Sequence, residues 1–212
     1  DDVTPYGLPM YIVKWLTGTP TPGFTGSNPE GFPDGVAGLD SDTYPDGWVN
    51  WAGRYEAVTD DDLLEKVREA LMKTNFKSPV KHPSADRVGR PKALYTNYNV
   101  ISGAKRVVRQ QNEQLGMDLD YADGEIRIKR IEFTYVPHLD DDNSDPLYGV
   151  NWATIKFCIL NGWLLKENGP SEQANSHNTL VTHIDLTHNL QCHNRRKGNF
   201  VLSKRSKTNS LT

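Results

Sequence analysis

The sequence lacks several features that would assign it to a class at once. Its 212 residues include only two cysteines, Cys158 and Cys192, too few for a disulfide framework and without the spacing of a metal pair. Both lie in strand-like sequence, so we expect buried free thiols in a reducing cytoplasm. No apolar run approaches the ~18 residues of a membrane-spanning helix, so no membrane contact is predicted.

The chain also lacks a strong net charge and a normal share of apolar residues. Lys and Arg number 24 against 27 Asp and Glu, a net charge of −3, so no bulk attraction to nucleic acid or anionic membrane is expected. Apolar residues make up 36%, below the usual ~45–50%. This deficit favours an elongated or loop-rich shape whose surface is completed by neighbouring molecules. Long loops alone would also lower the apolar share.

No catalytic motif is present. The sequence contains no Walker loop, GxGxxG, GxSxG, HExxH or CxxC pattern. The most enzyme-like residues are His183 and Asp185, which share one face of a predicted strand and could bind a metal, with His188 and His193 further along. Because one strand offers at most two ligands, the polar face of an amphipathic strand explains them better. We therefore predict no catalytic residue, no cofactor and no metal, and a protein that is not an enzyme.

A short acidic run at 140–145 resembles a calcium-binding loop. The template requires Gly at its sixth position and an acid at its twelfth, where this chain has Asp145 and Asn151. A solvated acidic turn is therefore the better interpretation.

Charge is unevenly distributed along the chain. Eight acids lie between Asp34 and Asp62 against one base, Arg54, whereas six bases and no acid lie between Arg195 and Lys207. This asymmetry is typical of head-to-tail contacts between copies, and also of ordinary solvated faces. A basic tail could alternatively contact DNA phosphates.

Residues 17–53 are rich in Gly and Pro and yet aromatic. Turn formers exclude long helices and strands there, while Phe24, Phe32, Tyr44, Trp48 and Trp51 argue against disorder. We predict an ordered loop that packs on a surface, either its own or a partner's. As interface residues we name Trp48, Trp51 and Arg54, with the alternative that the two indoles cap the chain's own core.

Two helices are predicted. Thr59 caps the first, at roughly 60–74, with Asp62 three residues on in a pattern like a capping box. The second begins near 96–99 and ends at Leu115 with Gly116 as its C′ residue; its buried stripe is Val100, Ala104, Val107, Val108, Gln111 and Leu115.

The rest of the chain predicts strands. Asp123-Gly124 indicates a hairpin turn, and a change of parity after Ile128 predicts a bulge or break near Arg130. Residues 155–159 alternate before a turn at Asn161-Gly162. A single long amphipathic strand is predicted over 180–193, and a short last strand over 199–203.

Several segments together resemble tailed-phage and prophage major capsid proteins. Their number and order carry the resemblance, which spans about 6–204, because no single segment is a mechanistic motif. The segments are Trp15, Phe24–Phe32, Gly38–Ser41, Trp48–Trp51, Leu94–Tyr98, Gln111–Gly116, Tyr148–Trp152 and Asn199–Ser203.

The resemblance implies an α+β protein with the capsid fold named after phage Hong Kong 97. On that basis we expect an axial-type lobe at 52–160 and a peripheral-type remnant formed by 1–51 and 163–212. Members usually carry a further amino-terminal part, and this chain opens on Asp1 rather than Met, so a processed, truncated or partly ordered product is expected.

The implied function is that of a structural subunit of the head. The chain would be made in the bacterial host cytoplasm and would self-assemble through hexamers and pentamers into the virion capsid around genomic DNA. Its partners would be other copies of itself, a scaffold protein or portal, and packaged DNA through non-specific contact only. The alternatives are a metal-dependent hydrolase using His183 and Asp185, and a DNA-binding module using the basic tail.

Overall fold

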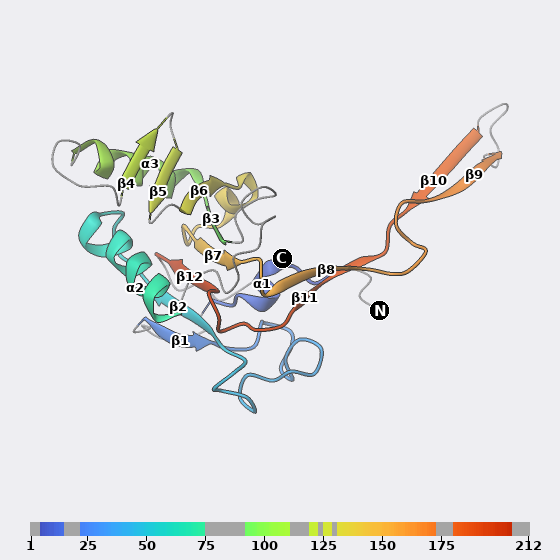
Figure 1. Cartoon of the computed structure of the whole chain (residues 1–212), viewed down its shortest axis with the longest axis horizontal. Helices are drawn as coiled ribbons and strands as arrows, with labels where there is room; N and C mark the ends of the chain where they lie inside the picture. The colour runs from blue at the N-terminus through green and yellow to red at the C-terminus, as the bar shows by residue number, and fades with distance from the viewer. Residues whose placement is uncertain are drawn as a thin grey trace.

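The computed structural model has a sheet-centred body from which a narrow β-ribbon arm projects (Figure 1). The structure describes residues 5–14, 22–74, 92–110, 119–122, 125–128, 131–172 and 180–204. Within them the protein is mixed α+β, dominated by one large sheet with few helices, as the sequence predicts at this coarse level.

The body is built on an eight-stranded sheet of order β1-β2-β12-β7-β3-β6-β5-β4. Most neighbours are antiparallel, but β12 pairs in parallel with β2, and β3 pairs in parallel with β6. The strands are β1 (Gly23–Gly26), β2 (Asn50–Arg54), β3 (Lys92–Thr96), β4 (Leu119–Ala122), β5 (Glu125–Ile128), β6 (Ile131–Tyr135), β7 (Leu147–Asn151) and β12 (Phe200–Ser203).

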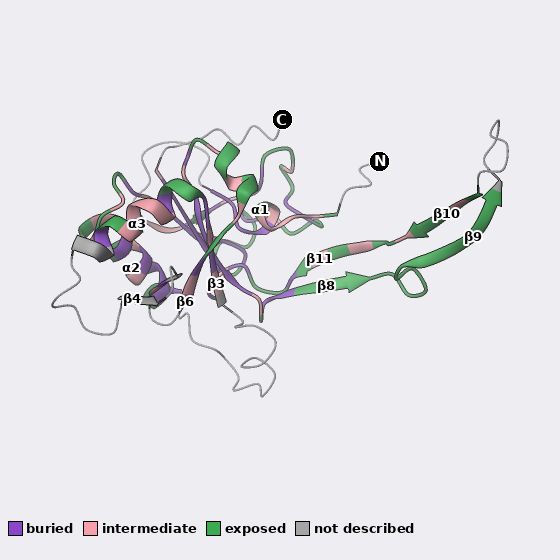
Figure 2. Ribbon diagram, turned by 90° about the horizontal axis from the view of Figure 1, so that it is seen from above, coloured by how far each residue is buried: buried purple, intermediate pink, exposed green. Residues whose placement is uncertain are grey.

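Alternating side chains along the strands of the sheet belong to two apolar clusters, one on each face of the sheet. On β12, Phe200 and Leu202 join the first cluster and Val201 joins the second. The first cluster is covered by helices α2 (Glu65–Lys73) and α3 (Tyr98–Gln110), which supply buried residues such as Leu71 and Val100. The second is covered by the amino-terminal segment with its short helix α1 (Leu8–Tyr11) and by Val36 and Trp48. The buried surface is therefore concentrated in the body (Figure 2).

The predicted cap of the first helix is confirmed. The hydroxyl of Thr59 accepts a hydrogen bond from the backbone N–H of Asp62 at 3.2 Å. The Asp62 carboxylate turns outward and accepts from the N–H groups of Glu56 and Ala57, at 2.6 and 2.7 Å, so the box is only half formed. The first turn is a π-helical segment, η1 (Asp60–Leu64), that leads into α2.

The second predicted helix corresponds to α3, and Val100, Ala104 and Val107 of its predicted stripe are buried. The predicted end at Leu115 and Gly116 lies outside the described residues, as do the side chains of Val108 and Gln111. A short 3-10 helix, η2 (Pro137–Asp141), follows β6.

The predicted break near Arg130 is a second hairpin. β5 pairs antiparallel with β6, and Ile128 lies directly opposite Ile131, so the parity change reflects a reversal of the chain. The hairpin expected at Asp123-Gly124 is confirmed by the pairing of Ala122 with Glu125. Residues 123–124 and 129–130 themselves lie outside the described residues.

The single strand predicted over 180–193 is wrong in one respect. Two strands occupy this stretch, β10 (Leu180–Asp185) and β11 (His188–Cys192), with Leu186 and Thr187 between them. The cause lies on the opposite side of the ribbon, where six residues, 160–165, separate β8 (Ile155–Ile159) from β9 (Lys166–Glu172). Ladder pairing cannot continue across an insertion of unequal length, so the strand is interrupted.

The sheet does not follow the expected division into 52–160 and 1–51 with 163–212. β1 and β12 belong to the second set of residues, yet they lie in the same sheet as β7, β3 and β6. The segment that stands apart from the body is instead 155–192, which forms the arm (Figure 1).

Arg195 joins the amino-terminal segment, the long loop between β1 and β2 (residues 27–49) and β2 itself. Its side chain is 1% exposed and donates to the carbonyls of Tyr11, Trp48 and Ser27, at 2.7, 3.0 and 2.8 Å. It also donates to the side-chain oxygen of Asn50 at 3.1 Å. Burial lowers the pKa of Arg195 to about 10, so the guanidinium remains charged at neutral pH.

Replacing Arg195 by Lys tests this junction. A lysine ammonium keeps the charge but cannot reproduce the planar fork that reaches four acceptors. We expect Arg195→Lys to lower the free energy of unfolding by about 3 kcal/mol, since each unsatisfied buried acceptor costs about 1–3 kcal/mol. Denaturant unfolding measures this. Arg196→Lys, at a half-buried position, is the matched control, and an equal effect of both changes would contradict the prediction.

The cap at Asp62 gives a pH-dependent prediction. Burial opposes the ionised form, but hydrogen bonds from Lys66, Ala57 and Glu56 hold the pKa of Asp62 below its ordinary value. A carboxyl group whose pKa is depressed by folding stabilises the fold at any pH above its unfolded-state pKa. This stabilisation is lost as the pH falls through the folded-state pKa. Asp62→Asn should therefore cost about 1 kcal/mol at pH 7, and denaturant titrations should show the difference from wild type shrinking at acid pH as the carboxyl group of Asp62 becomes protonated in the folded state. A cost that stayed constant with pH would contradict it.

Candidate interaction surface

The arm is a two-stranded ribbon in two sections. Near the body, β8 pairs antiparallel with β11; farther out, β9 pairs antiparallel with β10. Both views show it leading away from the body, and nearly all its residues are exposed (Figures 1 and 2). An isolated two-stranded hairpin is at best marginally stable in water, so this arm needs support from its root or from a partner.

The root of the arm is firmly held. Ile155 and Cys192 lie opposite one another and are both buried. The hydroxyl of Tyr11 donates to the carbonyl of Leu190 at 2.8 Å, and the side-chain oxygen of Asn189 accepts from the N–H of Tyr6 at 2.9 Å. The amino-terminal segment therefore supports β11, and the Arg195 junction follows three residues after it.

The near section of the arm has one apolar and one polar face. Directly paired residues share a face, which places Phe157 beside Leu190 and Ile159 beside His188. The opposite face carries Lys156 with Gln191 and Cys158 with Asn189. The rings of Phe157 and His188 are 4.9 Å apart, yet Phe157 remains 55% exposed.

The six residues 160–165, which we term the apolar loop, interrupt the ribbon. The loop is closed by hydrogen bonds between the backbones of Leu160, Trp163 and Thr187, at 3.0 to 3.1 Å. Gly162 has a φ of +81°, and Leu165 has a φ of +46°. A bulky residue in the left-handed region is strained by roughly 1–3 kcal/mol, and the side chain of Leu165 is nonetheless 63% exposed.

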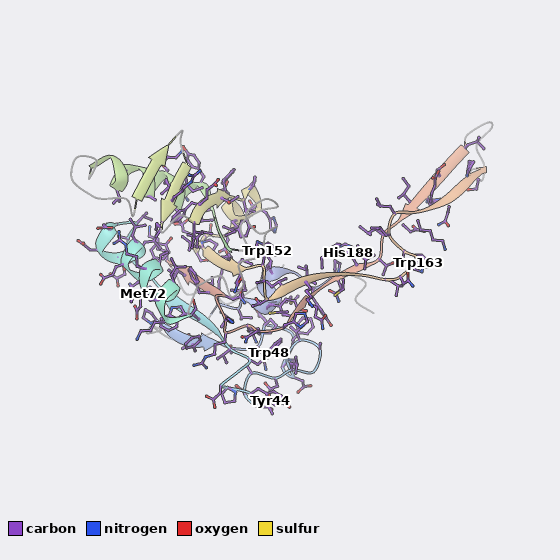
Figure 3. The ribbon with its side chains drawn as sticks, in the orientation of Figure 1. Tyr44, Trp48, Met72, Trp152, Trp163 and His188 are labelled. Carbon is purple, nitrogen blue, oxygen red and sulfur yellow. The ribbon has the colours of Figure 1, made fainter. Side chains whose placement is uncertain are left out.

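The arm carries most of the exposed large apolar side chains of the described residues. Nine of fourteen lie on it: Phe157, Ile159, Leu160, Trp163, Leu164, Leu165, Leu180, Ile184 and Leu186. Figure 3 shows Trp163 on the arm, well away from the buried Trp48 of the body. Soluble monomers rarely expose a continuous apolar patch beyond a few hundred Å², and a larger one marks an interaction site.

The structure gives His183 and Asp185 no metal-binding geometry. Both lie on β10 in the outer arm, where His183 pairs with Asn168 and the Asp185 carboxylate accepts from the Asn168 side-chain amide at 2.6 Å. Across the described part of the chain, no group of three or more His, Cys, Asp or Glu could hold a metal ion. His188 lies at the start of β11 in the near section of the arm, and His193 follows that strand at the root.

The acidic run at 140–145 has structural partners. Asp140 accepts from the backbone N–H of Tyr98 at 2.9 Å and from the hydroxyl of Tyr135 at 2.5 Å, and these bonds lower its pKa. Asp142 forms an ion pair with Lys14. Asp145 accepts from the side-chain amides of two asparagines of the β3–α3 junction, Asn97 and Asn99. These carboxylates therefore join elements of the body.

The three predicted interface residues lie largely within the body. Trp48 is 9% exposed and Trp51 is 5% exposed, each in one of the two core clusters. Arg54 is half-buried and donates to the backbone carbonyl of Lys204 at 3.2 Å. The two indoles thus pack as the alternative describes, and a contact role for them could use only their small exposed edges.

The sequence pattern of the arm predicts its strands but not their exposure. Alternation at 155–159 and 180–193 correctly indicates two-faced strands, and Asn161-Gly162 correctly indicates a turn. Alternation does not show whether an apolar face is covered by its own chain, so it could not reveal that Phe157 and Ile184 are exposed. The run Trp163-Leu164-Leu165, which lies between turn residues, is the part of the sequence that most favours exposed apolar side chains on the arm.

The prediction of two buried thiols is half right. Cys192 is buried and Cys158 is exposed, and both are free. Burial raises the pKa of Cys192 to about 11. The reason for the difference is position, because Cys158 lies on the open polar face of β8 and Cys192 lies at the root.

Thiol reactivity therefore reports the arm's geometry. We expect one thiol per native chain to react rapidly with a thiol-specific chromogenic reagent, and the second to react only on unfolding, because a thiolate is needed and Cys192 is both buried and protonated. A Cys158→Ser variant should lose the fast phase alone. Two fast thiols in the native wild type would contradict the described root.

In the described part of the structure no helix is long and apolar enough to cross a membrane. Comparisons with protein-family models, with curated proteins and with solved structures found no match to this chain.

Proposed function

We propose that this protein is a structural subunit of a tailed-phage or prophage head, with a Hong Kong 97-like fold, that assembles with copies of itself into the capsid. The observation that carries the proposal is the arm. A body with a well-buried core projects a ribbon bearing nine exposed large apolar side chains. Such a ribbon is suited to contacts with a neighbouring subunit.

The sequence supports the same proposal independently. The order and spacing of the segments between about 6 and 204 resemble those of major capsid proteins, and one of these segments, Asn199–Ser203, contains the central strand β12 of the sheet. In a shell, the other copies would be the main partners. A scaffold or portal would be additional partners, and DNA would be contacted without sequence specificity.

The two alternatives gain no support from a specific observation. His183 and Asp185 lie on an exposed ribbon with Asn168 as their polar neighbour. Within the basic tail, Arg195 is buried and hydrogen-bonded in the core, and the guanidinium of Arg196 lies over the ring of Phe24 at 3.9 Å. Residues 205–212 lie outside the described residues.

Removing the arm tests the proposal. Ile155 and Cys192 are direct cross-strand partners, so residues 156–191 can be replaced by Asn-Gly, which forms a two-residue hairpin turn. Electron microscopy of the complete gene product, expressed alone or with its scaffold, should show regular shells for wild type and none for the arm deletion. The deletion variant should still unfold cooperatively, because both core clusters remain essentially intact.

Two results would count against the proposal. Persistent monomers of the wild-type product under all conditions would overturn shell assembly. Regular shells formed equally well by the arm deletion would show that the arm does not serve in assembly, and the observation that carries the proposal would then be lost.

A further inference from the structure

The arm and one loop of the body have complementary surfaces. We term residues 28–48 the acidic loop and residues 155–166 with 186–192 the near arm. The acidic loop contains five acids and no base, whereas the near arm contains Lys156, Lys166 and His188 and no acid. Each surface also exposes large apolar side chains, namely Leu39 and Tyr44 on the loop and those of the apolar loop on the arm.

The acidic loop is a rigid surface. The side chain of Asn28 accepts from both the N–H and the hydroxyl of Ser41, at 2.9 and 2.8 Å. The Asp40 carboxylate accepts from the N–H groups of Asp42 and Thr43, and these bonds, that from Asp42 above all, lower its pKa to about 2. Beyond this framework Tyr44 is 53% exposed, at the edge of the body in Figure 3.

The free charges of the loop are available to a partner. The side chains of Glu30, Asp34, Asp42 and Asp46 are exposed, and none of them forms an ion pair among the described residues. Two basic groups of the described residues contact the loop: Arg196 donates to the backbone carbonyl of Asp46, and the buried Arg195 donates to that of Trp48. The loop therefore presents a negative field around two exposed apolar side chains.

We infer that the near arm of one copy docks, through its apolar loop, on the acidic loop of a second copy. Leu164 and Leu165, 61% and 63% exposed, would pack against Tyr44 and Leu39. Lys166, whose ammonium lies 4.4 Å from the centre of the Trp163 ring, would face the acids around them. The strain at Leu165 is consistent with a side chain held ready for a partner.

The area is sufficient for a stable contact. Seven of the nine exposed apolar side chains of the arm belong to the near arm and offer on the order of 700 Å², close to the roughly 800 Å² that each partner buries in a standard interface. Because the arm and the loop are different surfaces of one chain, the contact can repeat head-to-tail from copy to copy, and such contacts close into rings when the rotation permits. The inference rests on the proposed function for its choice of a second copy as the occupant.

A lipid bilayer fits the arm less well. An inserting loop concentrates its apolar side chains at a tip, whereas these are spread along the ribbon from Phe157 to Leu180. Immersing the ribbon would also bury the charged side chains of Lys166, Glu167 and Asp185, and moving ionised groups out of water is unfavourable. A protein surface that lies along the ribbon avoids both difficulties.

Paired surface variants test the inference in the full-length chain. The arm variant is Leu160→Ser with Leu164→Ser, the loop variant is Leu39→Ser with Tyr44→Ser, and Met72→Ser, at a 70% exposed residue of α2, is the matched control. Mass photometry and sedimentation should show association weakened at least tenfold in the first two and unchanged in the control. Circular dichroism should be the same in all, since only exposed side chains change.

Mixing the two variants separates arm-to-loop docking from arm-to-arm or loop-to-loop docking. The arm variant keeps an intact loop and the loop variant keeps an intact arm, so a mixture retains one good contact per pair and should stop at dimers. A photo-crosslinker attached to Cys158 of the wild-type chain should label residues 28–48 of a neighbouring copy.

The outcomes distinguish this inference from the proposed function. If the arm and loop variants formed shells as well as the wild type does, the docking inference would be overturned and the shell proposal would stand. Crosslinks that fall outside the acidic loop would have the same meaning. Labelling of lipid in vesicles of neutral phospholipid, without crosslinks between copies, would identify a membrane as the occupant. A wild-type chain that remains monomeric at all concentrations would overturn both.

Discussion

The buried guanidinium of Arg195 is the constraint on which the arrangement of the chain depends. It binds three backbone carbonyls and one side-chain oxygen, and these acceptors come from the amino-terminal segment, the long loop and β2. Without it, the carbonyls of Tyr11 and Trp48 in the second core cluster would lack this donor at a buried position. An uncompensated buried cation is unfavourable, but four good acceptors offset its desolvation. Its position three residues after β11 means that the same residue fixes the direction in which the arm leaves the body.

The body and the arm have opposite energetic characters. The body buries alternating side chains on both faces of a sheet, so that neither face has to be covered by a partner. Side chains in the body pack so closely that a Cβ added to Gly149 would lie 2.1 Å from the ring of Phe200. The arm leaves comparable apolar side chains in water and adds a strained leucine. Such an unfavourable surface persists because a rigid root supports it, and it gains stability only when it is covered.

The sequence predicted the parts of the fold that depend on local chemistry. The cap at Thr59, the hairpin before Glu125 and the reversal after Ile128 all follow from residues within a few positions of one another. The order of the sheet could not be predicted, because β12 pairs with β2 and β7 across more than 50 residues and no local pattern encodes such a partner. Burial of Cys192 but not Cys158 likewise depends on where the root ends.

The candidate site was predicted least well for the same reason. For Trp48 and Trp51 the sequence predicts either an interface role or a place over the chain's own core, and only long-range packing shows that both are almost completely buried. The arm's residues were placed in strands correctly, yet a period of two is the same for a covered and an uncovered face. Exposure belongs to the tertiary structure, and only the whole fold shows which apolar residues are left without neighbours.

The place of β12 in the sheet has a consequence for synthesis on the ribosome. This strand lies between β2 and β7 in the interior of the sheet, although it is the last strand of the described chain. A nascent chain that has produced β2, β3 and β7 therefore holds two separated portions of sheet with an unfilled slot between them. The arm is made before that slot is filled, so its apolar surface emerges while the body is still incomplete. A slow final step of this kind is typical of folds with long-range strand pairing.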